Sequence, residues 1–414
     1  MSELNTLKKQ YEAYVAEGLS LDMTRGKPSA QQLDLSNDIM TILGKSGFRS
    51  QDGFDCRNYS TPNLLAGLPE SKDLFAKALG VNNPNNIVVG GNSSLALMYD
   101  TVSWAMLNAM PGCDKSWSQQ GKIKFLTPVP GYDRHFSICE SLGIEMINIP
   151  LLGDGPDMDL IESLIKEDAS IKGIWCVPKY SNPTGETYSD ETVKRLANLS
   201  AKANDFRVFW DNAYAIHDLH GKQDKLADIF SLAPESKKNQ VIMYASTSKV
   251  TYAGAGVAVF VSSDDNVKWF LDIMKNKTIG YDKINQLRHV EFFKNYRSIE
   301  EHMKLHSDIL SPKFNKVDEV LTKILGAKGE YATWTKPNGG YFVSFDTKPG
   351  QAGRVVKLAA DAGVKLTKAG ATFPYGKDPE DKNIRIAPSL PNINEIEKAT
   401  EILATVTKMV ALEK

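Results

Sequence analysis

Two short segments carry side chains that suit chemistry on a carbonyl compound. The segment STSK, from Ser246 to Lys249, follows the apolar run VIMYA. A lysine amine can form a Schiff base with a carbonyl, and hydroxyl groups can bind a phosphate. The segment FWDNAY places Asp211 at the end of an apolar run, where its carboxylate could hold a protonated ring nitrogen, and Tyr214 could reach a phenolate oxygen. The simpler alternatives are an exposed lysine after a strand and an aspartate that caps a helix.

Two further polar residues lie after or within apolar runs. The segment SNPTG, which contains Asn182, follows GIWCVP, and NIRIAP places Arg385 inside an apolar stretch. The carboxyl end of a parallel strand is where α/β sheets bind ligands, which favours a binding role for Asn182. An arginine in a cleft can hold a carboxylate through two parallel hydrogen bonds. Taken singly, SNPTG could be a plain turn, and Arg385 could face solvent on an edge strand.

The elements that must position these residues alternate between strand and helix from about residue 70 to residue 300. Apolar runs such as NIVVGG, KIKFLTP and GIWCVP alternate with amphipathic stretches such as DETVKRLANLS. This alternation predicts βαβ units and an α/β fold with a mainly parallel sheet covered on both faces. We expect a large domain over residues 51–300 and a smaller α+β domain made of residues 1–50 and 301–414. In the latter, YATWTKPNGGYFVSFD predicts a β-hairpin around Asn338 and Gly339.

The composition is that of a globular enzyme. Of 414 residues, 42% are hydrophobic and 24% are charged, and 49 basic residues against 50 acidic ones give a net charge of −1. This balance argues against nucleic acid or an anionic membrane as the main partner, and no apolar run is long enough to span a bilayer. The four cysteines form no C-x-x-C pair and the six histidines show no metal-ligand spacing. We therefore expect a cytoplasmic, metal-free enzyme that acts on small molecules.

In their order and spacing, the four segments resemble the class I/II aminotransferases, which are fold-type I enzymes that use pyridoxal 5′-phosphate. LDMTRGKPSAQQLDLSN and STSKVTYAGAG are similar to the aspartate aminotransferase subgroup called type Ic. The resemblance covers residues 20–405 approximately. It implies a fold-type I transferase, with a mainly parallel sheet between helices in the large domain, a smaller α+β domain, and a homodimer with shared active sites.

The resemblance also implies a role for each matching residue. Lys249 matches the Schiff-base lysine, and Asp211 matches the aspartate that pairs with the cofactor's ring nitrogen. Tyr214 and Asn182 match residues beside the cofactor's 3′ oxygen. The remaining matches are Asn92, Ser93, Ser94 and Ser246 for the phosphate, Tyr132 for stacking on the ring, Tyr59 for the phosphate of the neighbouring subunit, and Gly26 and Arg385 for the substrate.

One position departs from the family pattern. Many relatives carry an arginine eight positions after the lysine, where it pairs with the phosphate, and this chain has Val257 there. Hydroxyls, backbone amides and a cation from elsewhere would then neutralise the phosphate. Lys283, in a stretch that matches one near the neighbour's cofactor, is the candidate cation. A surface lysine at the start of a helix is the alternative.

The implied reaction is a ping-pong transamination with aspartate and 2-oxoglutarate as substrates. A contact for the side-chain carboxylate is not fixed by the sequence, because Arg25, Lys283, Arg134 and Arg288 are all available. We take Arg25, beside Gly26, as the first choice. The alternatives are an aminotransferase for aromatic or other amino acids, a lyase or decarboxylase with the same cofactor, and a non-catalytic effector-binding domain. The last is disfavoured by the intact Lys249.

Overall fold

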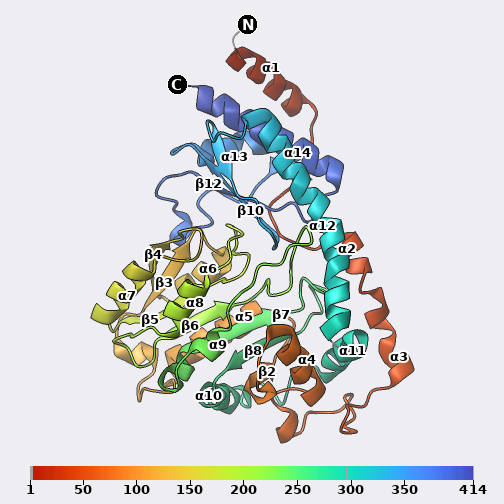
Figure 1. The fold of residues 1–414 in the computed structure, drawn as a ribbon, viewed down its shortest axis with the longest axis vertical. Coiled ribbons are helices and arrows are strands. Elements are labelled where there is room, and N and C mark those ends of the chain that lie inside the picture. The colour runs from red at the N-terminus through yellow and green to blue at the C-terminus, as the bar shows by residue number, and fades with distance from the viewer. Residues whose placement is uncertain (1–2, 295, 414) are drawn as a thin grey trace.

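A seven-stranded sheet forms the centre of the larger, lower part of the molecule (Figure 1). The computed structural model describes residues 3–294 and 296–413. In sheet order the strands are β2 (Ile87–Val89), β8 (Ala258–Ser262), β7 (Val241–Ser246), β6 (Arg207–Asp211), β5 (Ile171–Cys176), β3 (Lys124–Val129) and β4 (Glu145–Pro150). Every pairing is parallel except those of β8 with β7 and β2. The predicted α/β fold with a mainly parallel sheet is confirmed.

Side chains alternate between the two faces of this sheet, and each face has its own core. Trp175 and Phe209 pack on the side of helices α5 (Ser94–Leu107), α6 (Asp133–Ser141) and α10 (Asp264–Met274). Ile174 and Val208, one residue away in each strand, pack on the side of α4 (Pro69–Leu79), α7 (Met158–Glu167) and α8 (Asp190–Ala197). Because both faces are covered, the strands read as continuous apolar runs in the sequence.

A second unit holds both ends of the chain, at the top of Figure 1. Its antiparallel sheet has the order β12 (Asn383–Ile386), β10 (Val343–Thr347), β9 (Ala332–Trp334). The predicted hairpin joins β9 to β10, with a connection longer than a tight turn. Near the N-terminus, β1 (Leu21–Asp22) pairs with β11 (Val364–Lys365). The helices of this unit are α1 (Glu3–Ala16), α13 (Ala352–Asp361), α14 (Ile393–Leu412) and the C-terminal part of α12 (Tyr296–Leu325). The N-terminal part of α12 packs against α4 of the larger unit.

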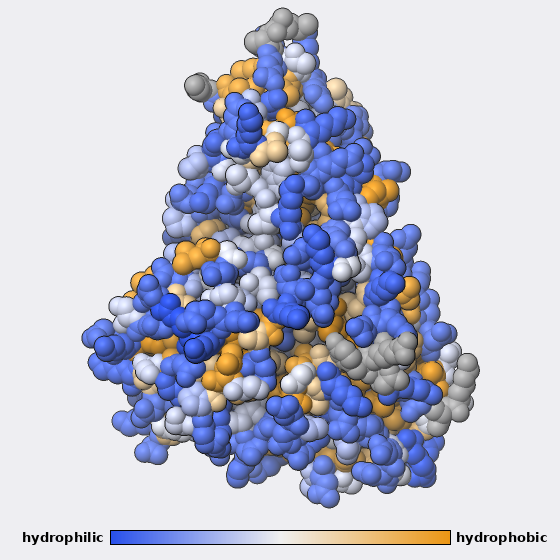
Figure 2. All heavy atoms as spheres, viewed as in Figure 1, coloured by the Kyte–Doolittle hydropathy of each residue, from blue (hydrophilic) through white to orange (hydrophobic). Residues whose placement is uncertain are grey.

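Short helices complete the chain. They are α2 (Ala30–Asp34), α3 (Ile42–Ser46), α9 (Ile229–Leu232) and α11 (Lys283–Phe293), with 3₁₀ turns at Asn37–Met40, Pro62–Leu64, Pro84–Asn86, Trp117–Gln120, Glu235–Gln240 and Pro374–Gly376. No helix in the described part of the chain is long and apolar enough to cross a membrane. On the face drawn in Figure 2, hydrophilic side chains predominate and apolar ones form small groups. The expected division at residues 50 and 300 stays a prediction.

The parallel strands β2, β3, β5, β6 and β7 all end at the same edge of the large sheet. Three of the predicted functional segments follow these ends: Asn182 comes after β5, Asp211 closes β6, and Ser246 closes β7 with Lys249 just beyond. The carboxyl-terminal edge of a parallel sheet is where α/β proteins place ligands. The fold therefore brings together segments that are far apart in the sequence.

The middle of β5 approaches its neighbours so closely that only glycine fits. A Cβ at Gly173 would lie 2.5 Å from Cε1 of Phe125 and 2.9 Å from Cε2 of Phe209. Both rings are fully buried among other aromatic side chains, so they have little room to move. We expect Gly173→Ala to lower the free energy of unfolding by about 1–3 kcal/mol through overpacking.

Denaturant unfolding would measure this loss. Gly44→Ala is the matched control, because no heavy atom lies within 4 Å of a Cβ at Gly44 in α3. The control should unfold like the wild type or be stabilised by about 0.5–1 kcal/mol, since alanine suits a helix better. Equal unfolding midpoints for Gly173→Ala and the wild type would mean that the two rings can move apart.

Candidate active site

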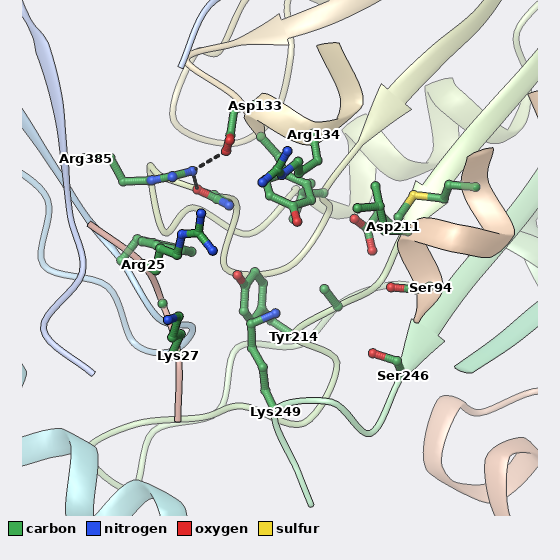
Figure 3. A pocket seen from close by; sticks show the side chains of 18 residues that line it. Arg25, Lys27, Ser94, Asp133, Arg134, Asp211, Tyr214, Ser246, Lys249 and Arg385 are labelled. Atoms are coloured by element: carbon green, nitrogen blue, oxygen red, sulfur yellow. Dashed lines mark hydrogen bonds and ion pairs between the residues drawn. The ribbon is translucent and has the colours of Figure 1, made fainter. Parts of the chain in front are cut away.

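A cavity of about 270 Å³ lies at the carboxyl-terminal edge of the large sheet. The smaller unit contributes Arg385 and Phe342 to its lining, and the segment before α2 contributes Arg25, Gly26 and Lys27. Figure 3 shows Arg25, Lys27 and Arg385 across the cavity from Asp211, Ser94 and Ser246. The charged lining side chains are Arg25, Lys27, Arg134, Lys249 and Arg385 on the basic side and Asp133 and Asp211 on the acidic side. The cavity therefore suits an anionic ligand.

Lys249 lines this cavity, and its amine lies beside two neighbouring tyrosine rings. Its Nζ lies 5.2 Å from the ring centre of Tyr214 and 5.9 Å from that of Tyr341. Burial lowers the pKa of the Lys249 amine, and the Asp211 carboxylate opposes part of that shift. A lowered pKa raises the fraction of neutral amine, which is the form that acts as a nucleophile or a base. The alternative reading, an exposed lysine after a strand, is wrong.

The backbone beside this lysine is held by a buried hydrogen-bond network. Nε2 of Gln32 donates to the Tyr341 hydroxyl at 2.8 Å, and that hydroxyl donates to the Lys249 carbonyl at 3.4 Å. Nε2 of His306 lies 3.0 Å from the Val250 carbonyl, and its Nδ1 lies 3.1 Å from the Gln32 amide. The Lys249 side chain thus extends from a fixed backbone, which reduces the number of positions that its nitrogen can take.

Asp211 is a buried carboxylate with only one of its oxygen atoms bonded. Oδ2 lies 3.0 Å from Nε2 of His135, whose ring stacks on Trp175 with centres 4.4 Å apart. Oδ1 is buried and has no hydrogen-bond partner among the described residues. Asp211 is not a helix cap, because turns follow β6. One oxygen is therefore fixed and the other is available to a donor in the cavity.

Ser94 and Ser246 lie at the end of the cavity opposite Arg385 (Figure 3). Ser94 is the first residue of α5, and the hydroxyl of Ser93 caps this helix by accepting from the Ala96 amide. The hydroxyls of Ser246 and Ser248 lie 2.8 Å apart. A helix N-terminus with free N–H groups and adjacent hydroxyls is suited to a phosphate.

Tyrosine and asparagine side chains line the middle of the cavity. Tyr132 packs edge-on against His135, with ring centres 5.0 Å apart. Burial raises the pKa of the Tyr214 hydroxyl well above its ordinary value, and Tyr132 and Asp211 raise it further. Tyr214 is therefore a protonated donor at neutral pH. The carbonyl oxygen of Asn182 accepts from Arg385 at 3.3 Å, which leaves its amide nitrogen as a donor.

Arg385 lies on edge strand β12, but its side chain is only 7% exposed and lines the cavity. Its Nη1 donates to Oδ1 of Asp133 at 2.8 Å, and its guanidinium lies 4.8 Å from the Phe342 ring centre. The reading of Arg385 as solvent-facing is wrong. A Cβ at Gly26 would lie 2.6 Å from Cζ of Phe342, so glycine is needed where this segment passes the ring.

Other predicted site residues lie outside the cavity of the single chain. Asn92 donates to the Gly254 carbonyl at 3.0 Å, and the Tyr59 side chain is 78% exposed. Lys283 begins α11 but is buried, so it is not a surface lysine, and its Nζ donates to the Tyr281 carbonyl at 3.1 Å. Val257 is buried in the apolar core. Of the four candidate cations, Arg25 and Arg134 line the cavity, whereas Lys283 and Arg288 do not.

Several residues of the site have no individual role in the sequence-based analysis. They are Lys27, Asp133, His135 and Phe342. The spacing of Tyr132 and His135, three positions apart at the start of a predicted helix, places them on one face and could have indicated His135. Asp133 and Phe342 belong to different units of the fold, and no local pattern connects them to Arg385.

Comparisons with known proteins agree with this geometry. The model of the aspartate amino-transferase family matches residues 1–414. The aspartate aminotransferase of Corynebacterium glutamicum is 43% identical over 408 residues, which cover 98% of this chain and 93% of that protein. The crystal structure of an aspartate transaminase from the same organism has a TM-score of 0.95 at 42% identity and covers 99% of this chain and 95% of that one.

A more distant structural neighbour shows the fold alone. The α-aminoadipate aminotransferase of Thermus thermophilus, in complex with N-(5′-phosphopyridoxyl)-L-leucine, has a TM-score of 0.76 at 19% identity. It covers 97% of this chain and 95% of that one. The fold and the cavity define a fold-type I aminotransferase that depends on pyridoxal 5′-phosphate. Within that class, the chain belongs to the aspartate aminotransferase family.

The residues of the cavity fit pyridoxal 5′-phosphate. Lys249 offers an aldehyde an amine whose pKa burial lowers, and the unbonded Oδ1 of Asp211 offers an acceptor to a protonated ring nitrogen. The α5 N-terminus with Ser94 and Ser246 suits the phosphate. The cofactor-binding function predicted from the resemblance is confirmed, while the individual roles of these residues stay predictions.

We expect Asp211→Ala to fold and bind the cofactor but to lose turnover by about 10²–10⁴-fold, because the group that favours the protonated ring nitrogen is gone. Steady-state turnover, with the visible spectrum and the unfolding midpoint of the loaded protein, would measure this. Asp190→Ala, at an exposed position at the start of α8, is the matched control. Near-normal turnover of Asp211→Ala would remove Asp211 from the catalytic machinery.

Proposed function

We propose that this aminotransferase exchanges the amino group between L-aspartate and 2-oxoglutarate in a ping-pong reaction. The observation that carries this proposal is a group of cations beyond Arg385, because Arg25, Lys27 and Arg134 also line the cavity. Both proposed substrates carry two carboxylates, and one arginine can hold only one of them bidentately. The relative from Corynebacterium glutamicum named an aspartate aminotransferase supports the same substrate.

The side chains divide the work of this reaction. Arg385 binds the substrate α-carboxylate and orients the Cα–H bond, and the neutral Lys249 amine takes the proton from Cα. Asp211 holds a proton on the ring nitrogen of the bound cofactor. The bound cofactor supplies an electron sink for the charge that develops at Cα. Tyr214 and Asn182 donate hydrogen bonds toward the ring's oxygen, while Ser94 and Ser246 hold the phosphate. Because both half-reactions use this one site, the first product leaves before the second substrate binds.

Arg25 is the proposed contact for the side-chain carboxylate. It lies one residue before Gly26, in the segment that passes Phe342 at the mouth of the cavity. Its guanidinium is on the same side of the cavity as Arg385 and away from the phosphate end (Figure 3). Because both guanidinium groups lie at the same end of the cavity, we propose that Arg385 and Arg25 bind the two carboxylates of one substrate. Lys27 and Arg134 supply further positive charge.

We expect Arg25→Ala to lower kcat/KM for aspartate by about 10²-fold or more, and that for alanine by less than about threefold, because alanine lacks the second carboxylate. Arg385→Lys should impair both substrates similarly, since lysine loses the planar fork that orients the shared α-carboxylate. Steady-state kinetics with both amino acids would measure these ratios. If Arg385→Lys impaired only aspartate and Arg25→Ala impaired both, the two assignments would be reversed.

We also propose that the protein is a homodimer with shared active sites. The exposed Tyr59 side chain supports this, because its hydroxyl can reach a neighbouring chain. Two exposed apolar side chains are close by in the sequence: Met40 precedes Tyr59, and Ile279 precedes α11. Burial lowers the pKa of Lys283 to about 8, and we propose that this lysine supplies the cation missing at Val257. A cytoplasmic location stays a prediction.

Mixing two inactive variants tests the shared site. If Tyr59→Ala and Lys249→Ala are each strongly impaired, a mixed dimer has one site with both substitutions and one with neither. Up to about half of the wild-type activity per mixed dimer should then return as subunits exchange. Full activity of a species with the mass of one chain, measured by light scattering, would contradict the shared site.

A further inference from the structure

Arg385 forms an ion pair with a carboxylate of its own chain inside the cavity. Its Nη1 donates to Oδ1 of Asp133 at 2.8 Å and to the carbonyl oxygen of Asn182 at 3.3 Å. Figure 3 shows the Asp133 carboxylate at the tip of the Arg385 guanidinium, inside the cavity. This ion pair joins the start of α6 to strand β12, which are 252 positions apart in the sequence.

The Nη1 end of the guanidinium is already engaged. Asp133 and Asn182 both accept from Nη1, whereas Nε is buried and has no hydrogen-bond partner among the described residues. A carboxylate that forms two parallel hydrogen bonds at the Nη1–Nη2 end meets Asp133 there. At that end of the guanidinium, the two carboxylates cannot both make their best contact.

Asp133 is free to give up this contact. It is the first residue of α6, its side chain is 32% exposed, and its carboxylate forms no other hydrogen bond within the described residues. A carboxylate at a helix N-terminus is stabilised by the helix dipole even when its partner is lost. The side chain can therefore turn toward solvent at modest cost.

We propose that Asp133 is a positioning residue that occupies Arg385 in the free enzyme, so that every substrate binds by exchanging its α-carboxylate for that of Asp133. This inference rests on the proposed role of Arg385. In the free enzyme the pair keeps the charge of a nearly buried guanidinium satisfied. On binding, the enzyme breaks one ion pair to form another, which weakens substrate affinity. The weakening is the same for all amino acids, because the α-carboxylate is common to them.

Asp133→Asn tests the exchange, since it keeps the size of the side chain and removes its charge. We expect KM for aspartate and for alanine to fall by a similar factor, about 3–30-fold, in line with a partly buried charge pair. The dissociation constant of maleate, an unreactive dicarboxylate, should fall by the same factor when titrated into the holoenzyme by calorimetry. kcat should stay the same or fall if product release becomes limiting.

Two further variants serve as a charge control and as a second test of Asp133. Glu140→Gln removes one negative charge from the same helix at an exposed position outside the cavity and keeps its acceptor for the Tyr375 amide. It should leave all three constants unchanged. Asp133→Ala removes both the charge and the hydrogen bond and should tighten binding like Asp133→Asn, which guards against a misplaced asparagine.

Three outcomes would overturn the proposal. A higher KM for both amino acids would mean that Asp133 holds Arg385 in its productive position. Unchanged constants would mean that the ion pair does not oppose binding. Tighter binding of aspartate and maleate with alanine unchanged would indicate general repulsion of the second carboxylate. Failure of the wild type to use aspartate would overturn the proposed substrate alone, since alanine would still report on Asp133.

Discussion

The arrangement of this site depends on Asp211, a buried carboxylate with a hydrogen-bond partner at only one of its oxygen atoms among the described residues. Removing Asp211 from water carries a large free-energy cost unless its oxygen atoms find partners. His135 supplies one partner at 3.0 Å, and Trp175 fixes the plane of that imidazole by stacking. The second oxygen has no partner among the described residues. A protonated ring nitrogen would satisfy it, so the same feature that is unfavourable in the protein alone favours binding of the cofactor.

The start of helix α6 carries residues for several parts of the site. Tyr132, Asp133 and His135 follow the end of β3 within six residues and reach three parts of the site. His135 contacts Asp211, Tyr132 lines the middle of the cavity, and Asp133 reaches Arg385. A single helix start thus links the large sheet to the smaller unit. Movement of α6 would disturb proton placement and carboxylate binding together.

Sequence patterns identify the parts of the site that follow strand ends. Asn182, Asp211, Ser246 and Lys249 could be predicted because each follows an apolar run, and parallel strands bring their ends to one edge. The contacts between distant segments could not be predicted in this way. The Arg385–Asp133 pair and the Gln32–Tyr341 hydrogen bond join residues more than 250 positions apart. Burial of Lys283 was also missed, because a lysine at a helix start usually lies in solvent.

The replacement of a phosphate-binding arginine by Val257 fits the charge distribution of the cavity. Val257 lies in the apolar core beneath β8, and its amide donates to the Thr247 hydroxyl at 2.9 Å. At the phosphate end, the described lining contributes the hydroxyls of Ser94 and Ser246 and the start of α5. The cations gather instead at the other end, around Arg25 and Arg385. Within the single chain, helix N–H groups and hydroxyls are what can hold the phosphate, and the proposed Lys283 cation would come from the neighbouring subunit. The electrostatic potential is therefore most positive at the end proposed for the substrate, and it would strengthen the binding of a dicarboxylate more than that of a neutral amino acid.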